Sequence, residues 1–372
     1  MSQGRIQNQL AHIRKTRGIA AADLARRAGI SRQTIYAIEA GTYVPNTEVT
    51  LRLARELEVS VEELFSLPEE STATPASITS DLLSNTAPAK GQPVRLCRIG
   101  SRWISIPVSA TPYYLPEADA VISSHAKNRA QLVAFSQDES FKKRLVLAGC
   151  DPATNLLARV VERASGVEVV PAAASSKLAL QWLEEGKVHI AGSHLEDPAT
   201  GEFNLPYLKS EFPREDFAVV TFARWEEGLV VAKGNPKRIR AIADLANKTV
   251  TFMNREPGSG SRALLDQLLR KSGIPAKSVA GYSRVAYGHL AAAYAVVSSE
   301  ADCCLATRSA ARTFGLDFIP LHSERYDLVM RKRTLELPAA QAFLDVLQRA
   351  SLRRQLEILA GYDTTHTGAL LS

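Results

Sequence analysis

The sequence predicts a multidomain protein, with an all-α head of five helices followed by a larger, two-lobed α/β domain. Three observations lead to this fold class. Residues 20–40 carry two runs of helical periodicity separated by a glycine. From about residue 141, apolar strand-like runs alternate with amphipathic helical ones. The length of 372 residues is enough for two or three domains.

The segment 20–40, AAADLARRAGISRQTIYAIEA, predicts two helices joined by a tight turn. Gly29 suits the left-handed backbone at the end of the first helix, and Ser31 can cap the second. The apolar positions at helical spacing are Leu24, Ala25, Ala28, Ile35 and Ile38. This pattern predicts a helix-turn-helix whose exposed second helix enters a DNA major groove.

The same domain extends over residues 1–67. A first helix is expected over 5–16 with Ile6, Leu10 and Ile13 facing inward, and Pro45 and Asn46 predict a turn. Two further helices follow from the apolar positions Leu51, Leu53, Ala54, Leu57, Val61, Leu64 and Phe65. The first 38 residues carry seven basic side chains against one acidic one, whereas residues 39–67 carry two arginines against six glutamates. The basic part coincides with the motif, which favours phosphate contacts.

The head resembles the lambda-repressor-like, or xenobiotic-response-element (XRE), family of helix-turn-helix regulators, through the pattern S-R-x-T-I-x-x-I-E-x-G and the following P and L-x-x-L-x-V. The resemblance implies binding to double-stranded DNA. It implies that Arg32 and Gln33, with Thr34 or Tyr36, contact base edges. Ser31 and nearby amides would hold phosphate, Arg26 is a further DNA-binding candidate, and Glu39 would support the packing.

Residues 68–92 contain three prolines among many Ser, Thr and Ala, which predicts a linker. Residues 93–140 include two strand-like runs, RWISIPV and ADAVISS. This connector either belongs to the second domain or mediates a dimer contact. A homodimer is expected because one small head reads only half of a DNA site.

Residues 141–372 form the α/β domain, and their strand–helix alternation predicts a largely parallel sheet. The segments GCDPATNLL, GSHLEDPATGEFN, NREPGSGSRALLD and GYDTTHTG resemble the type II periplasmic-binding-protein fold, in its cytoplasmic molybdate-binding-like form. The resemblance implies two crossings between lobes, near 223–233 and 318–330, and a second lobe over about 233–320. Ligand would bind in the cleft between the lobes.

The chemistry of NREPGSGSR suits an anion, because glycines admit close backbone approach and a helix N-terminus follows. Other polar residues at predicted helix starts and strand ends would converge on the same cleft, although a serine before a helix is often only a cap. The candidate ligand-binding residues are Thr154, Asn155, Ser175, Ser176, Ser193, His194, Asn254, Arg255, Ser259, Gly260, Ser261, Arg262 and Tyr287. His289 is a further candidate to close the far side.

These features predict a one-component transcriptional regulator that senses a small anion, with molybdate or tungstate implied by the resemblance. Arg255 and Arg262 leave a second ligand class open, a small organic or phosphorylated metabolite. A non-sensing dimerisation domain is a further alternative. A nucleotide-cofactor enzyme is disfavoured because GSGSRA lacks the acidic residue expected about 20 positions later.

No catalytic residue, metal or cofactor is expected, and the four cysteines are interpreted as reduced thiols in apolar segments. No apolar run approaches the roughly 20 residues of a membrane helix. Because the N-terminus lacks a charged-then-apolar signal segment, a cytoplasmic location without membrane contact is expected.

Overall fold

The computed structural model describes residues 6–66, 77–108, 115–136, 141, 143–213 and 216–371, which belong to two compact units within 1–74 and 75–372. The head has five helices, as predicted. They are α1 Leu10–Thr16, α2 Ala21–Ala28, α3 Arg32–Glu39, α4 Thr47–Glu56 and α5 Val61–Leu64. A short pair, β1 Gln7–Asn8 and β2 Phe65–Ser66, joins the two ends of this unit.

The turn of the helix-turn-helix has the predicted geometry. Gly29 adopts a φ of 71°, and the Ser31 hydroxyl accepts a hydrogen bond from the Thr34 amide at 3.0 Å. Both helices bury their predicted apolar positions in one core. Glu39 supports the packing through a bidentate ion pair with Arg14, at 2.6 and 3.1 Å.

Two details of the head differ from the prediction. Ile6 is exposed because the chain around it is extended beside β2, and α1 begins only at Leu10. Leu51 is also exposed, since α4 turns Leu53 and Ala54 to the core.

The predicted linker and connector contain a closed β-barrel. Its strands are β3 Ser77–Leu82, β4 Pro93–Ile99, β5 Arg102–Pro107, β6 Ala120–Ala126 and β7 Arg129–Ala134. The linker prediction over 68–92 is therefore wrong for 77–82, and residues 68–76 lie outside the described part. The polar composition of β3 was misleading because Ser80 is buried, with its hydroxyl 2.7 Å from that of Ser105.

The barrel packs against the first lobe of the α/β domain. Leu83, Cys97 and Ile104 share a core with strand and helix residues of that lobe. Arg144 fastens the contact, because its guanidinium donates to the Leu96 carbonyl at 2.7 Å and forms an ion pair with Asp119. The described residues of 93–140 thus belong to the larger unit, while a role of this segment in a dimer contact stays a prediction.

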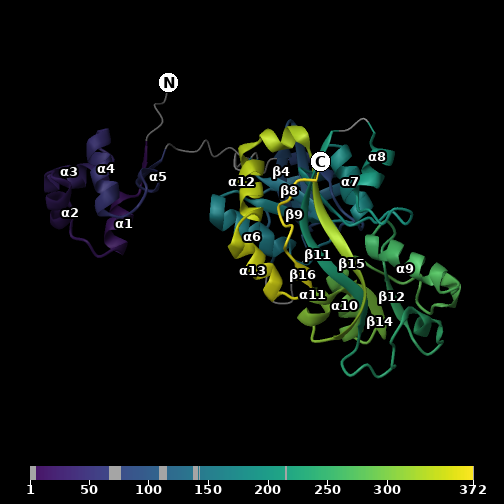
Figure 1. The fold of residues 1–372 in the computed structure, drawn as a ribbon. Coiled ribbons are helices and arrows are strands. Elements are labelled where there is room, and N and C mark those ends of the chain that lie inside the picture. Colours follow the sequence, from purple (N-terminus) through teal and green to yellow (C-terminus); the bar gives the residue numbers. More distant parts are fainter. Residues whose placement is uncertain are drawn as a thin grey trace. The chain divides into compact units, whose positions relative to one another are not determined.

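A single nine-stranded sheet runs through both lobes (Figure 1). Its order is β13-β12-β14-β11-β15-β10-β8-β9, and β16 Tyr362–Asp363 pairs with β11. The long strands β11 Phe217–Val231 and β15 Asp317–Arg331 pair antiparallel over their length and connect the lobes. They occupy the positions of the two predicted crossings. Within each lobe the other neighbouring strands are parallel.

The first lobe covers both faces of its part of the sheet with helices. Its elements are β8 Leu145–Gly149, α6 Thr154–Ser165, β9 Val169–Ala173, α7 Ser176–Glu184, β10 Ile190–Ser193, α8 Leu205–Glu211, η4 Lys332–Glu336, α12 Pro338–Leu347 and α13 Ala350–Ile358. Along β8, Leu145 and Leu147 pack toward α6 and α12, whereas Val146 and Ala148 pack toward α7 and the barrel. Burial on both faces is typical of parallel strands.

The second lobe lies between the crossings. Its elements are η2 Ile242–Ala246, β12 Phe252–Arg255, α9 Gly260–Lys271, η3 Ala276–Ser278, β13 Val285–Ala286, α10 His289–Val297, β14 Cys303–Thr307 and α11 Arg308–Thr313. Strand β14 buries Cys303 and Leu305 on one face and Cys304 and Ala306 on the other. These two cysteines are free and buried, as expected from their apolar segment.

His189 gives the first lobe a testable pH dependence. Its Nδ1 accepts a hydrogen bond from the Val146 amide at 3.0 Å, and burial lowers the pKa of its imidazole from 6.5 to about 4. Between pH 6.5 and 4 the unfolded chain takes up this proton while the folded chain does not, so stability falls as the pH falls. We expect His189→Asn, which keeps an acceptor, to remove about 1–3 kcal/mol of this acid destabilisation.

The measurement is urea unfolding at pH 7 and pH 4.5. His125 is exposed, so His125→Asn is the matched control and should leave the pH slope unchanged. An equal slope in His189→Asn and the unsubstituted chain would exclude the assigned role of His189.

Candidate functional site

Five ionisable side chains meet where the lobes join, and we call them the crossing cluster: Cys150, His194, Glu227, His289 and Glu324. Cys150 and His194 follow the carboxyl ends of β8 and β10, and His289 is the first residue of α10. Glu227 lies on β11 and Glu324 on β15. Four of the five are essentially inaccessible to solvent, whereas Cys150 is partly exposed. Both lobes and both crossings therefore contribute to one site.

The histidines of the cluster hold defined positions. His194 Nδ1 lies 2.5 Å from Glu324 Oε2, which also accepts the Trp225 indole N–H at 3.3 Å. His194 Nε2 lies 3.4 Å from Cys150 Sγ, and His289 Nε2 lies 3.8 Å from the same sulfur. The thiol thus faces one ring nitrogen of each histidine.

Charge in the cluster is poorly compensated. Burial and the neighbouring Glu324 raise the pKa of Glu227 well above 4.5, and burial raises the pKa of Glu324 to about 7. Burial and nearby Arg255 lower the pKa of His289 well below 6.5. Among the described residues, neither oxygen of Glu227 nor Nδ1 of His289 has a hydrogen-bond partner. Buried polar groups of native proteins are seldom left unpaired. Here Glu227 Oε1 and His289 Nδ1 face each other at 3.8 Å, beyond hydrogen-bond distance.

Arg255 stands beside the cluster at the end of β12. Burial alone would lower its pKa, but its two hydrogen bonds to Glu256, at 2.9 and 3.0 Å, and the charges around it raise the pKa of the guanidinium above its usual value. Its third contact is the Ser261 hydroxyl at 3.4 Å. Arg262 donates to the Arg255 carbonyl at 3.2 Å and lies 4.1 Å from the Tyr282 ring centroid. Both arginines are thus engaged within the second lobe.

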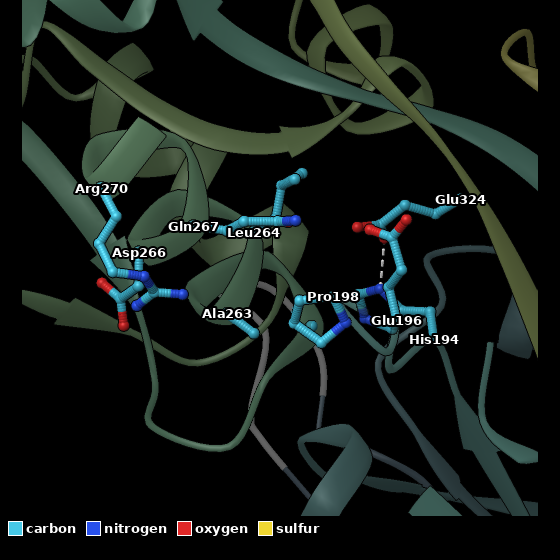
Figure 2. A pocket seen from close by; sticks show the side chains of 10 residues that line it. His194, Glu196, Pro198, Ala263, Leu264, Asp266, Gln267, Arg270 and Glu324 are labelled. Carbon is cyan, nitrogen blue, oxygen red and sulfur yellow. Dashed lines mark hydrogen bonds and ion pairs between the residues drawn. The ribbon is translucent and has the colours of Figure 1, made fainter. Parts of the chain in front are cut away.

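Two cavities open on the cluster from different sides. The first, of about 240 Å³, lies between α9 and the loop after β10, and is the α9 pocket (Figure 2). Figure 2 shows Leu264 and Arg270 of α9 on one side and His194 and Glu324 on the other. The second, of about 220 Å³, is lined by the first residues of α6 and α10 and by Cys150, and is the α6–α10 pocket.

The predicted ligand residues fall into three groups. Thr154, Asn155 and Tyr287 line the α6–α10 pocket, and His194 and Gly260 line the α9 pocket. The remaining eight lie in neither of these two cavities: Ser175, Ser176, Ser193, Asn254, Arg255, Ser259, Ser261 and Arg262. Their ligand contacts stay predictions.

Several of these eight have structural partners instead. Ser175 and Ser259 cap α7 and α9, as the alternative interpretation of such serines anticipated. The Ser176 hydroxyl accepts from the His194 amide at 3.3 Å, and Asn254 donates to the Tyr282 carbonyl at 2.9 Å. Ser193 is buried with no hydrogen-bond partner for its hydroxyl among the described residues.

Gly260 has a packing reason. A Cβ at this position would lie 2.5 Å from the His194 ring, so only glycine lets α9 begin against that histidine. A close backbone approach to a ligand was expected at Gly260. In the structure, the group that lies close to its backbone is the His194 side chain.

Cys150, Glu227 and Glu324 are site residues that the sequence did not predict. The apolar surroundings of Cys150 in the sequence predict a buried structural thiol, but its sulfur faces two histidines. The glutamates sit in the strand-like runs FARWEEG and HSERYD. An acidic residue inside a predicted central strand is an available signal, because burial of an unpaired charge is costly.

The head presents the predicted DNA-contacting residues on its surface. Arg32, Gln33 and Tyr36 of α3 are exposed, and Arg32 donates to the Tyr36 hydroxyl at 2.9 Å. Ser31 is the N-cap, with its hydroxyl also 2.8 Å from that of Thr34. Arg26 is exposed and forms an ion pair with Asp23 at 2.6 Å.

Comparison with known families agrees with this architecture. Residues 158–348 match the family described as PBP superfamily domain, and residues 8–70 match a helix-turn-helix domain family. The chain belongs to the PBP superfamily and carries an XRE-like helix-turn-helix domain at its N-terminus. No helix in the described ranges is long and apolar enough to cross a membrane.

Individual relatives match parts of the chain. The uncharacterized protein YvgK of Bacillus subtilis is 34% identical over 230 residues, which is 62% of this chain and 74% of YvgK. An uncharacterized HTH-type transcriptional regulator of Methanothermobacter thermautotrophicus is 41% identical over 58 residues, 15% of this chain and 84% of that protein.

Among solved structures, the tungstate ABC transporter of Geobacter sulfurreducens is similar with a TM-score of 0.43 and 16% identity. The match covers 59% of this chain and 99% of the transporter chain. The sulfate-binding protein SubI of Mycobacterium tuberculosis has a TM-score of 0.44 and 16% identity, and covers 59% of this chain and 86% of its own.

Proposed function

We propose that the chain is a one-component transcriptional regulator in which a small ligand between the lobes controls DNA binding by the head. The observation that carries this proposal is the presence, in one chain, of an exposed recognition helix and a two-lobed binding domain with cavities at the lobe junction. The helix-turn-helix family match over residues 8–70 and the relatives named as HTH-type transcriptional regulators support the assignment. It is a binding function, and because its target is DNA we expect it to act in the cytoplasm.

The α6–α10 pocket is the proposed ligand site. The N-terminal residues of α6, which has 12 residues, and of α10, which has nine, both line it. Helix N-termini offer free amides and a positive dipole end to an anion. Asn155 and Tyr287 add neutral donors at its wall. Thr154 also lines the pocket, and its hydroxyl donates to the Asp151 carbonyl at 2.8 Å at the start of α6.

The proposed ligand is a small oxyanion such as molybdate or tungstate. Arg255 and Arg262 suggested a carboxylate or phosphate-bearing metabolite, but both are engaged with protein groups and neither lines this pocket. The pocket therefore offers helix ends and neutral donors, beside the ionisable Cys150, Asp151 and His289. Burial raises the pKa of Asp151 to about 7, which favours the uncharged form of this acid next to an anion. A small carboxylate remains the second candidate, because the volume of about 220 Å³ also admits one.

A thermal-shift screen of the purified full chain tests the ligand class, with molybdate, tungstate, sulfate, phosphate and small carboxylates. A ligand that binds only the folded state raises the midpoint. We expect molybdate or tungstate to do so, and Thr154→Val to abolish the shift. Thr313→Val is the matched control, since Thr313 makes a similar hydroxyl-to-backbone bond at 2.9 Å on α11, and neither cavity is lined by it. A rise in the midpoint with carboxylates alone would refute the proposal that the ligand is an oxyanion.

DNA readout is assigned to α3. We expect Arg32→Ala and Gln33→Ala each to remove about 1–3 kcal/mol of discrimination at one base pair, because each side chain can make two bonds to a base edge. The measurement is binding to an in vitro selected operator and its single-base variants. Arg55→Ala, an exposed arginine of α4, should leave the preference intact. Unchanged preference in both α3 variants would refute their role.

A homodimer completes this proposal, because two heads can read two half-sites. Ligand binding changes DNA affinity only if it favours one arrangement of the lobes over another.

A further inference from the structure

The crossing cluster contains a set of atoms that the proposed anion site does not explain. Cys150 Sγ, His194 Nε2 and His289 Nε2 face one another, with sulfur–nitrogen distances of 3.4 and 3.8 Å. Each of the three residues offers one ligand atom within 4.8 Å of the others. In a tetrahedral site with metal–sulfur bonds of about 2.3 Å and metal–nitrogen bonds of about 2.0–2.1 Å, neighbouring ligand atoms lie roughly 3.5 Å apart.

We propose that Cys150, His194 and His289 bind one divalent transition-metal ion of the zinc class, with the fourth position open toward the α6–α10 pocket. Cys150 and His289 both line that pocket, so an ion between them would be reached from it. Three protein ligands and one open position define a site that can exchange its fourth ligand. This site goes beyond the proposed regulation, which does not depend on it.

The second ring nitrogens support this assignment. His194 Nδ1 lies 2.5 Å from Glu324 Oε2, and an ionised Glu324 accepts the Nδ1 proton in the tautomer that leaves Nε2 free to bind metal. His289 Nδ1 lies 3.8 Å from Glu227 Oε1. Metal-binding histidines usually turn their other nitrogen to a carboxylate or carbonyl, which orients the ring and raises its basicity. The two glutamates on the crossing strands are placed for this role.

The unpartnered atoms are the independent observation. Both Glu227 oxygens and His289 Nδ1 are buried and lack hydrogen-bond partners in the described part of the chain. An ion bound to His289 Nε2 requires a proton on Nδ1, which then has Glu227 within a small movement. The ion also supplies positive charge beside two buried carboxyl groups, whose burial is otherwise costly.

The donor set selects the class of ion. One thiolate and two imidazoles suit Zn²⁺ and its neighbours, whereas Mg²⁺ and Ca²⁺ prefer oxygen ligands. Binding displaces the thiol proton, because the thiolate is the metal ligand.

The test is a cobalt titration of the reduced, chelator-stripped full chain. We expect one equivalent of Co²⁺ to bind with a thiolate-to-cobalt charge-transfer band and the visible spectrum of a tetrahedral site, and Zn²⁺ to displace it. Cys150→Ala should lose the charge-transfer band, while Cys97→Ala, whose thiol lies in the core between the barrel and the first lobe, should keep it. Glu324→Gln should weaken affinity about 10–100-fold with the spectrum retained, which a merely structural role would not produce.

Three outcomes overturn the metal site. The first is absence of the charge-transfer band at saturating Co²⁺, and the second is the same band in Cys150→Ala. The third is alkylation of Cys150 by iodoacetamide at equal rates with and without Zn²⁺, which would show that the ion does not bind the thiol. The titration contains neither DNA nor oxyanion, so its failure is separate from failure of the proposed regulation.

Discussion

Replacing Arg255 with Met should destabilise the α/β unit by about 3–5 kcal/mol, because it leaves a buried carboxylate without its counterion. Arg255 is 1% exposed and Glu256 is 5% exposed, and they share two hydrogen bonds. Met keeps most of the apolar stem, so the loss comes from the charge and not from a cavity.

Tryptophan fluorescence during urea unfolding measures this change. All three tryptophans, Trp103, Trp182 and Trp225, lie outside the head, so the signal reports the larger unit. Arg255→Lys keeps the charge and should cost less than Met. Adding Glu256→Gln to Arg255→Met should recover part of the loss. A double variant that is less stable than the single one would contradict the pairing.

Substituting Gly192 with Ala should cost about 2–3 kcal/mol through overpacking. Gly192 on β10 lies beside Gly149 on β8, the strand paired with it. A Cβ at Gly192 would lie 1.9 Å from the Tyr326 hydroxyl and 2.5 Å from its Cζ, and one at Gly149 would lie 2.3 Å from the hydroxyl. The two glycines thus make room for a fully buried ring whose hydroxyl accepts from the Cys150 amide at 3.3 Å.

A double-mutant cycle isolates this contact. In a Tyr326→Leu background the ring atoms that meet the new methyl group are gone, so Gly192→Ala should cost less than about 1 kcal/mol. Equal costs of Gly192→Ala in both backgrounds would show that steric conflict with Tyr326 is not the cause. The same substitution should also disturb metal binding at Cys150, since the ring holds that amide.

Local signals made the head predictable. The Gly29 turn, the Ser31 cap and the apolar positions of α2 and α3 act within one or two helical turns, and the structure has all three. The exceptions are at the edges. The strand directly after Ile6, Gln7–Asn8, pairs with Phe65–Ser66, almost 60 residues away, a contact that periodicity does not report.

The sequence did not predict the barrel, because the partners of its first strand, β3, are also distant in the chain. Its strands are short, and the inward face of β3 includes Ser80 as well as Leu82, so it lacks the usual alternation of apolar and polar residues. Closure of β3 on both β5 and β7 satisfies the backbone, and the Ser105 hydroxyl satisfies Ser80. Strands β5 and β7 and the Ser105 hydroxyl come together with β3 only in the folded chain, so local sequence patterns do not indicate them.

The site was also predictable only where the signals are local. The sequence indicated thirteen candidate ligand-binding residues at strand ends and helix starts, and five of them line one of the two cavities at the lobe junction. Glu227 and Glu324 reach it from the middle of long crossing strands, where a ligand residue was not expected. Pairing of β11 with β15 brings these residues, about 100 positions apart, to one place.

A ligand held between the lobes must change the affinity of the head for DNA if the chain is a one-component sensor. The direct measurement is the Kd of the full chain for an operator selected in vitro, with and without saturating amounts of the anion that gives the thermal shift. The expected result is at least about a fivefold change in Kd, with an equal change in anion affinity when DNA is bound. An unchanged Kd, under conditions where the thermal shift shows the anion bound, would contradict sensing by this chain.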